Sequence, residues 1–567
     1  MRGLSLVRSP AYICQSIDQQ DSPASINANL RLPVMPIPQS ANWPVPASFN
    51  AANRRLTGIR YNRIVLSRRK YNRRKYMKLV ERVVEKREYE AKIYGELRDH
   101  PINLDEIFDI VVNTIHFQYA GYPHKRQYYT PSEYHTYVFT HYRYQTLTYE
   151  MLVRSLHQFV ADMHDRHLTF TCDDWIDYRN LAMRYRVRAT KDVLYVTQAD
   201  PETGLVPGDK ILKVNNQTPP GVRKLTRGNC FYSNDPEREL WGGYLRMATS
   251  LQVEHADGTQ ERLEMKPCPA AQYTRPIEEE YPISCTLLPA KQKVEVLQTE
   301  EKRIVLLQVQ RMDESVLSEL ITAHRQDIEE SDTLILDLRR CIGGDEGALW
   351  ELFPYITDKE ITLRELLADE GSYCLCTKEN CSLRISQLKA YRETILPGNE
   401  MEGDASQETQ LPATGNAESS SVLAQQLSIL DEEIAFYREN MGKGLVFRAP
   451  DPIEDEKITP AAKSPARVII LTDTFCENEG EQFVAMCRRC GSKVTLIGRP
   501  TMGSLDYFDP IPLQVHTHMV LSYPIRMTKA AYEGRGISEK GIPVDIYIPW
   551  TPEEITKDVI LEQALEL

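Results

Sequence analysis

The pattern of apolar and polar residues predicts a buried strand near the middle of the chain. Residues 334–338 form an apolar run that is too short for a helix of its own, and the chain then reaches two consecutive glycines, Gly343 and Gly344. A short apolar run followed by glycines is typical of a buried strand that ends in a tight turn. Such a strand commonly brings backbone groups to a site, because glycine allows close approach.

A second buried strand is predicted at Val468 to Leu471. A polar loop that ends at Asn478 follows it, and residues 479–490 have the pattern of a helix that Gly491 terminates. The order of strand, loop and helix is a common setting for catalytic nucleophiles. The two stretches together therefore predict a functional site at one edge of a sheet.

The surrounding apolar patterns predict an α/β core. A strand is expected at Ile304 to Val309, and helices are expected at residues 316–328, 347–355 and 422–439. Alternation of strands and helices is typical of α/β folds. Residues 399–421 contain little that could be buried, so they predict a disordered surface insertion.

Upstream of this core the pattern changes. Residues 77–175 are helical in pattern, and the stripe of apolar residues from Met151 to Met163 favours packing in a core. Residues 176–275 instead predict short strands, including a hairpin whose turn is the Asp257-Gly258 pair. We therefore expect a helical segment followed by a β module.

The charge distribution adds a basic N-terminal leader. The 567-residue chain has a net charge of −12, but residues 1–76 carry 13 Lys and Arg against two acidic residues, which leaves about −23 for the remainder. The leader is rich in Pro, Ser, Asn and Ala, so we expect it to be disordered. Its arginines and tyrosines are able to contact nucleic acid. A solvated extension, or a true start at Met77, accounts for it better.

Location and cofactors follow from what the sequence contains. It shows neither a signal peptide nor an apolar run of membrane length, so we expect a cytoplasmic protein. Two cysteine groups have suggestive spacing, but neither has a matching second pair of metal ligands. We expect reduced, structural cysteines, no metal and no other cofactor. The two groups are Cys374, Cys376 and Cys381, and the pair Cys487 and Cys490.

Three motifs occur in a fixed order along the second half of the chain. They are Asp337-Leu-Arg with its following glycine pair, the segment from Leu471 to Glu481, and the segment from Gly498 to Tyr507. Each is weak alone, but their order and spacing resemble the tail-specific (C-terminal processing) serine peptidase family, especially its tricorn-like branch. The resemblance extends from about residue 104 to the end.

This resemblance implies an architecture. Residues 283–567 would form an α/β peptidase core of the crotonase-like or ClpP-like ββα superhelix type, preceded by the N-terminal helical segment. Residues 176–275 would form a PDZ-like module, which can capture an extended peptide by adding it to a sheet edge. A β module that only packs on the core or covers the site is the alternative.

The resemblance also implies a set of site residues. His167, directly after the helix that ends at Met163, falls on the position of the general base, and Glu539 falls on that of the acid that orients it. The oxyanion would be stabilised by the amide of Gly343 or Gly344, together with the amide of Glu479.

The nucleophile position departs from the family. Asn478 stands where the family has its catalytic serine, and a carboxamide has no proton that a base can usefully remove. We interpret Asn478 as the N-cap of the following helix, with Glu481 as its capping-box partner. The lysine base of the C-terminal processing branch is also absent, because Ser504 occupies its place. Arg166 replaces a serine beside the histidine.

Two other side chains could supply a nucleophile. Cys476 lies on the same loop as Asn478, and a helix N-terminus can lower the pKa of a nearby thiol. A packing role for Cys476 is nevertheless favoured. Ser504 lies on a loop that should line the cleft, although related small residues there are not nucleophiles.

Two classes of function remain open at this point. The chain is either a serine-type peptidase that cleaves polypeptides or peptides, or a catalytically inactive pseudo-peptidase that binds extended peptides as a scaffold or regulator. Both classes have polypeptide or peptide partners and no membrane partner. Nucleic-acid binding through the leader is the weakest alternative, and the oligomeric state is left open.

Overall fold

The computed structural model describes residues 104–567, apart from internal gaps of which the longest are 129–148, 173–180, 226–237, 270–291 and 396–416. The leader, the start at Met77 and the first predicted helix after it lie outside the described residues. Within the part that is described, no helix is both long enough and apolar enough to cross a membrane.

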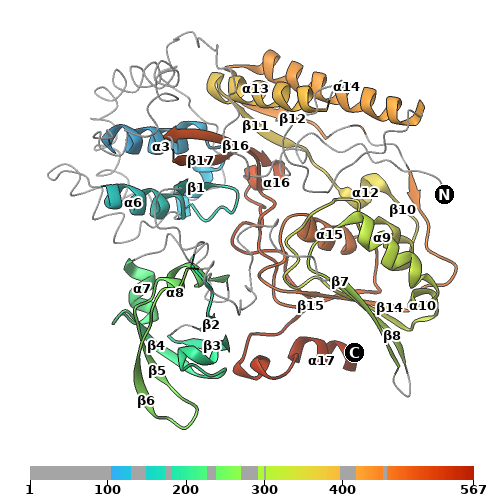
Figure 1. The fold of residues 1–567 in the computed structure, drawn as a ribbon. Helices are drawn as coiled ribbons and strands as arrows, with labels where there is room; N and C mark the ends of the chain where they lie inside the picture. Colours follow the sequence, from blue (N-terminus) through green and yellow to red (C-terminus); the bar gives the residue numbers. More distant parts are fainter. Residues whose placement is uncertain are drawn as a thin grey trace, which may run out of the picture.

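A six-stranded sheet forms the centre of the C-terminal half (Figure 1). All neighbouring strands in it are parallel except the outer pair formed by β7 and β8. The central strands are buried on both faces, which explains why they appear in the sequence as continuous apolar runs. In spatial order the strands are β18 (Ile546–Tyr547), β15 (Val494–Gly498), β14 (Arg467–Thr472), β9 (Thr333–Asp337), β8 (Arg303–Val309) and β7 (Gln292–Gln298).

Helices cover both faces of this sheet. One face packs against a hydrophobic cluster that includes α9 (Glu314–Ala323), α10 (Arg325–Glu330), α12 (Leu363–Leu367) and α15 (Glu479–Cys487). The other face packs against α17 (Val559–Glu566). The predicted strands at 304–309, 334–338 and 468–471 and the predicted helix after Asn478 are confirmed.

Two predicted helices differ from the structure. The single helix expected at 316–328 is two helices, α9 and α10, because His324 ends the first and begins the second. The helix expected at 347–355 is limited to the 3-10 turn η8 (Trp350–Leu352) and the short helix α11 (Phe353–Ile356). Pro354 starts that last turn, and residues before it form turns instead.

A second, antiparallel sheet joins the two ends of the described chain. Its strands are β1 (Thr169–Cys172), β17 (Met519–Thr528), β11 (Ser372–Cys376) and β12 (Gly444–Arg448), with β16 (Tyr507–His516) also paired to β17. The helices α3 (Leu104–Gln118), α6 (Tyr149–Ala161), α13 (Lys378–Thr394) and α14 (Ala417–Asn440) contribute to one hydrophobic cluster with it. The N-terminal helices thus share a core with C-terminal strands.

The helix predicted at 422–439 is confirmed as α14. It begins at Ala417, so the last five residues of the predicted disordered insertion, 417–421, are helical and that part of the prediction is wrong. The start of the insertion lies outside the described residues. The remaining short elements are α4 (Tyr122–Tyr128), α16 (Lys529–Tyr532), η9 (Pro552–Ile555) and the strand pair β10 (Ile361–Thr362) and β13 (Lys457–Ile458).

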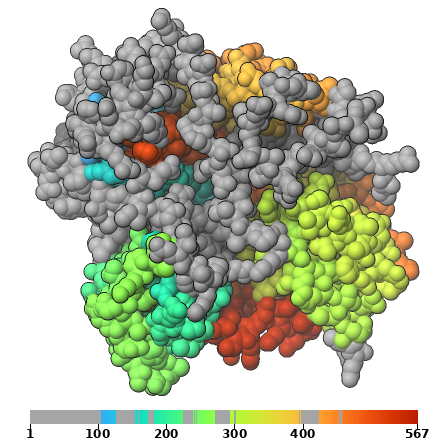
Figure 2. Space-filling model, viewed as in Figure 1, coloured from blue at the N-terminus to red at the C-terminus, as the bar shows by residue number. Residues whose placement is uncertain are grey.

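The β module is a five-stranded antiparallel sheet with two short helices. Its strands are β2 (Tyr185–Ala189), β3 (Leu194–Ala199), β4 (Lys210–Val214), β5 (Ser250–Glu254) and β6 (Gln260–Glu264) in this spatial order, with η5 (Pro201–Thr203), α7 (Pro219–Leu225) and α8 (Gly242–Arg246). The hairpin predicted at Asp257-Gly258 is confirmed by the β5 and β6 pairing. The module forms a lobe beside the C-terminal segment (Figure 2).

Buried arginines hold the β module against the core. Arg238 is 2% exposed, and its guanidinium donates hydrogen bonds to the carbonyl oxygens of Met502 and Lys540 at 2.9 and 2.8 Å. Arg188 of β2 lies over the ring of Phe475, and its guanidinium is 3.8 Å from the carboxylate of Asp473. The module therefore contacts the loops that follow β14 and β15, where the predicted site lies.

Candidate active site

Asn478 occupies a strained turn between a strand and a helix. It lies between β14 and α15 with φ 51° and ψ −127°, a conformation that residues other than glycine rarely adopt and that costs about 1–3 kcal/mol. A strained turn at this place is how α/β hydrolases expose their nucleophile. β9 runs parallel to β14, so the loop with the two glycines emerges at the same edge of the sheet.

His167 lies directly against Asn478. Its Nε2 atom is 3.2 Å from Oδ1 of Asn478, although 311 residues separate the two in the chain. Its Nδ1 atom is 2.7 Å from the carbonyl oxygen of Tyr507, at the start of β16. A backbone carbonyl thus orients the imidazole ring.

The hydrogen bonds of this pair define what it can do. A carbonyl oxygen only accepts, so Nδ1 of His167 donates to Tyr507, and in a neutral ring Nε2 is then the acceptor that a general base requires. The side-chain oxygen of Asn478 also only accepts, and its amide nitrogen donates to the carbonyl oxygen of Ile342 at 3.2 Å. Contact between Nε2 and that oxygen therefore needs a protonated imidazole or a rotated amide. In neither case does Asn478 offer a proton for acyl transfer.

The expectation that Asn478 caps α15 in a capping box is wrong. Its side chain makes no hydrogen bond to the first turn of the helix. Glu481, its expected partner, is fully buried and accepts hydrogen bonds from the backbone amides of Gly503 and Ser504 at 2.5 and 2.7 Å and from the hydroxyl of Thr501. Glu481 therefore organises the 501–504 loop instead of capping a helix.

Ser504 links that loop to Asn478. Its hydroxyl donates to Glu481 at 2.8 Å and accepts from the backbone amide of Asn478 at 2.9 Å. The hydroxyl is buried with Ser504 4% exposed, so both of its hydrogen-bonding roles are structural. Cys476 is completely buried, and burial holds the pKa of its thiol well above the ordinary value. Neither group is positioned or activated as a nucleophile.

The two glycines play different parts. Gly344 directs its amide at the carboxylate of Glu479, with N to Oε2 at 2.9 Å. The carbonyl oxygen of Gly343 accepts a hydrogen bond from the amide of Met312 at 2.8 Å. A Cβ atom on Gly343 would lie 2.8 Å from the Cβ of Asn478, so glycine is required for this close approach, and its φ is 94°.

Glu539 lies against a different histidine from the one expected. Its carboxylate is 3.0 Å from Nδ1 of His164 and 3.7 Å from Nζ of Lys125, which also donates to the carbonyl oxygen of His164. Burial raises the pKa of Glu539, but the hydrogen bond from His164 and the charge of Lys125 outweigh it and hold the pKa below the usual range. The ring nitrogens of His167 bond elsewhere, as described above.

Arg166, next to His167, pairs with a loop residue beside Asn478. Its Nε atom is 3.2 Å from the carboxylate of Glu477. The guanidinium thus joins the loop before β1 to the loop before α15. This ion pair is partly exposed and fixes the two loops relative to one another.

The clustered cysteines lie in hydrophobic surroundings. Cys374, Cys376 and Cys381 are buried between β11 and α13, and Cys487 and Cys490 are buried at the end of α15. Burial raises the pKa of the Cys487 thiol well above its ordinary value. Among the residues that the structure describes, no group of three or more His, Cys, Asp and Glu side chains is arranged to hold a metal.

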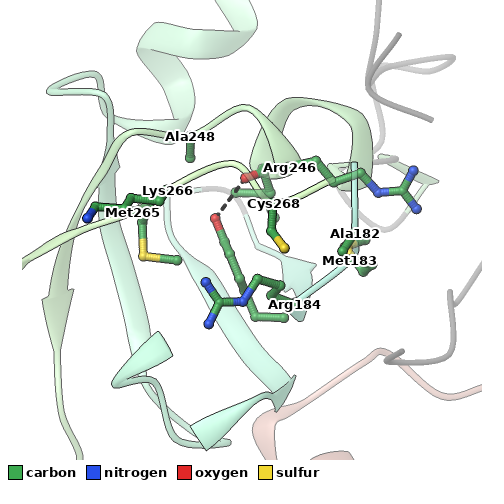
Figure 3. Close-up of a pocket in the computed structure, with 10 residues that line it drawn as sticks. Ala182, Met183, Arg184, Arg246, Ala248, Met265, Lys266 and Cys268 are labelled. Carbon is green, nitrogen blue, oxygen red and sulfur yellow. Dashed lines mark hydrogen bonds between the residues drawn. The ribbon is translucent and has the colours of Figure 1, made fainter. Parts of the chain in front are cut away.

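A separate pocket lies in the β module, between the start of β2 and α8 (Figure 3). The hydroxyl of Tyr185 donates across it to the carbonyl oxygen of Leu245 at 3.0 Å. Arg246 and Lys266 also line the pocket, but their charged ends point away from it in Figure 3, and the guanidinium of Arg184 is 3.4 Å from the carboxylate of Asp200. β2 is an outer strand of its sheet, so the pocket lies next to a sheet edge.

The sequence matches a known family model over the region that contains most of this site. Residues 303–548 match the model described as Peptidase family S41. Over these residues the chain is similar to peptidase family S41. A search of curated protein sequences finds no match.

Solved structures resemble this protein in fold. Mature CPAF in complex with lactacystin aligns with a TM-score of 0.54 and 14% identity, over 82% of this chain and 97% of that chain. Another structure of mature CPAF aligns with a TM-score of 0.52 and 14% identity, over 80% and 94% of the two chains. At such identities the likeness supports the mixed α/β fold and not a shared activity.

Two features of the candidate site were missed from the sequence. The carbonyl oxygen of Tyr507 orients His167, and a backbone group leaves no residue-type signal. The carboxylate of Glu479 accepts a hydrogen bond from the amide of Gly344, although only the backbone amide of Glu479 was expected to contribute to an oxyanion site. The signal available in the sequence was an acidic residue directly after Asn478.

Proposed function

We propose that this protein binds extended polypeptides in the cleft beside Asn478 and does not hydrolyse them. In this proposal residues 283–567 form a crotonase-like or ClpP-like core, and residues 176–275 are its PDZ-like module. The observation that carries the proposal is the position of Asn478. It stands in the strained turn that would present a nucleophile, with its oxygen 3.2 Å from Nε2 of His167.

The chemistry of the site supports binding without turnover. Acyl transfer needs a nucleophile whose proton passes to a base, and Asn478 cannot supply one. The possible substitutes, Cys476 and Ser504, are buried and already packed or hydrogen bonded. Gly344, in contrast, is exposed, so a chain can approach the edge of the cleft.

The β module supports the peptide as ligand. An outer strand offers amides and carbonyls to an extended chain, and the guanidinium of Arg184, at the start of β2, is the group there that a peptide carboxylate or an acidic side chain would contact. The buried contacts of Arg238 hold this module against the loops of the site. A peptide held by the module would therefore be near the cleft.

Wild-type protein and the Asn478→Ser and Asn478→Ala variants test the proposal. We expect the wild type to bind fluorescent peptides with free or blocked carboxyl termini in polarisation assays, to hydrolyse none of them, and to resist a fluorophosphonate probe. Arg184→Ala is the binding variant and should weaken binding of free-carboxylate peptides more than of blocked ones. Asp257→Ala, on the exposed hairpin turn, is the control.

Hydrolysis by the wild type would overturn the proposal. If it persists in Asn478→Ala and is lost in Cys476→Ala or Ser504→Ala, the chain is a peptidase with that nucleophile. If no peptide binds at high micromolar concentration, the peptide-binding role is wrong.

A further inference from the structure

The side chain of Glu479 is folded back over the loop of the site. The residue is 5% exposed, although it lies at the first position of α15 and next to the exposed Gly344 loop. Its Oε2 atom accepts a hydrogen bond from the amide of Gly344 at 2.9 Å. The acidic side chain at the start of α15 is thus held by a backbone N–H group of the loop that follows β9.

The amides of Gly344 and Glu479 are the donors that an oxyanion would need. Gly344 is the second residue of the glycine pair after β9, and Glu479 directly follows the nucleophile position at Asn478. A tetrahedral intermediate in acyl transfer is stabilised by donors 2.7–3.1 Å from its oxygen, and the carboxylate oxygen of Glu479 already lies within that range of the Gly344 amide. That amide cannot serve both anions at once.

The surroundings show how closely the carboxylate fits. A Cβ atom on Gly343 would lie 2.2 Å from Oε2 of Glu479, so the carboxylate fills the space that the glycine leaves open. Burial raises the pKa of Glu479, the hydrogen bond from the Gly344 amide lowers it, and the nearby carboxylate of Glu346 raises it further. Burial and the carboxylate of Glu346 both disfavour a charged Glu479 side chain at this place, and the hydrogen bond from the Gly344 amide opposes them.

We propose that the carboxylate of Glu479 is an internal ligand of the oxyanion site, which keeps a substrate carbonyl oxygen off the amide of Gly344 independently of Asn478 and leaves the rest of the cleft open to a peptide. The inference rests on the proposed function in taking Asn478 as the nucleophile position. The site that Glu479 occupies is a site for a carboxylate or a similar small oxyanion. When the Glu479 side chain is removed, an external carboxylate takes its place on the same amide.

Formate tests this on the full chain. In Glu479→Ala, formate should raise the melting temperature by several degrees above the value in chloride at equal ionic strength, because formate replaces the missing carboxylate. Wild type should show no such difference. Glu346→Ala is the matched control, since it removes a neighbouring, mostly buried carboxylate that bonds to Gln482 and not to the glycine amide.

Equal responses to formate in Glu479→Ala, Glu346→Ala and wild type would overturn the inference. A Glu479→Ala protein that is soluble only when formate is present would support it. If that variant cannot be obtained, Asn478→Ser and Asn478→Ser/Glu479→Gln are compared for labelling by a fluorophosphonate. The double variant should label at least tenfold faster, and equal rates, including no labelling of either, would overturn the inference.

Peptide hydrolysis by the wild type would refute the proposed function but would leave the formate result unchanged. A failed formate experiment would leave the peptide-binding assays unchanged. The two ideas can therefore fail separately.

Discussion

Replacing Glu481 by alanine should loosen the loop that supports the site. Glu481 is completely buried and accepts hydrogen bonds from the amides of Gly503 and Ser504 and from the hydroxyls of Thr501 and Ser504. In Glu481→Ala two buried backbone amides lose their acceptor. Each such loss costs about 1–3 kcal/mol, so a total of about 4 kcal/mol is expected, which is a large part of a typical domain's stability.

Hydrogen exchange of residues 500–504, followed by mass spectrometry, measures this loss locally. Since about 1.4 kcal/mol corresponds to a tenfold change, the protection of this segment should fall roughly 1,000-fold in Glu481→Ala. Glu481→Gln keeps one accepting oxygen but turns an NH2 group toward donors, so its loss should be intermediate. Glu346→Ala, the control, removes a single hydrogen bond from Gln482 and should change protection less than about tenfold.

A change of less than tenfold in Glu481→Ala, or the same change in Glu346→Ala, would refute the reasoning. It would show that the amides of the loop find other acceptors when the carboxylate is removed. The altered loop should also affect the position of Asn478, because the hydroxyl of Ser504 donates to Glu481 and accepts from the backbone amide of Asn478.

Three further outcomes follow from single contacts. Gly344→Val should abolish soluble expression or lower the melting temperature by many degrees, because Gly344 has φ 140° and a Cβ atom there would lie 2.3 Å from a backbone carbonyl oxygen. Gly347→Ala is the control and should have a mild effect, because its Cβ would have no contact under 3.5 Å. Arg384→Met should reduce the free energy of unfolding by about 3–5 kcal/mol in urea titrations, because it leaves a buried carboxylate unpaired, while Arg392→Met breaks an exposed pair and should cost under about 1 kcal/mol. Glu539→Gln should be less stable than wild type at neutral pH, because the pKa of Glu539 is lowered in the folded chain and its carboxylate stabilises the fold. The difference in stability should shrink as the pH falls below about 4.5 and Glu539 becomes protonated, and a difference that grows in acid would contradict this.

The strands of the six-stranded sheet were predictable because their signal is local. Strands β8, β9 and β14 are apolar runs bounded by polar residues or glycines, and a run that is buried on both faces needs no partner to be recognised. The antiparallel sheet was harder to see. β16 and the first half of β17 alternate buried and partly exposed positions, and β17 pairs with β1 from the other end of the chain, so the role of these strands depends on long-range pairing.

For the candidate site too, some features were predictable from the sequence and others depended on the tertiary structure. The resemblance to a peptidase family was enough to single out His167 and Asn478, and tertiary structure brings their side chains within 3.2 Å. It also determined that Glu539 contacts His164, that a backbone carbonyl orients His167, and that Glu479 turns its carboxylate onto the amide of Gly344. Residue types and spacing carry the identity of the possible groups, whereas the direction of each side chain is set by donors and acceptors that only the fold brings beside it.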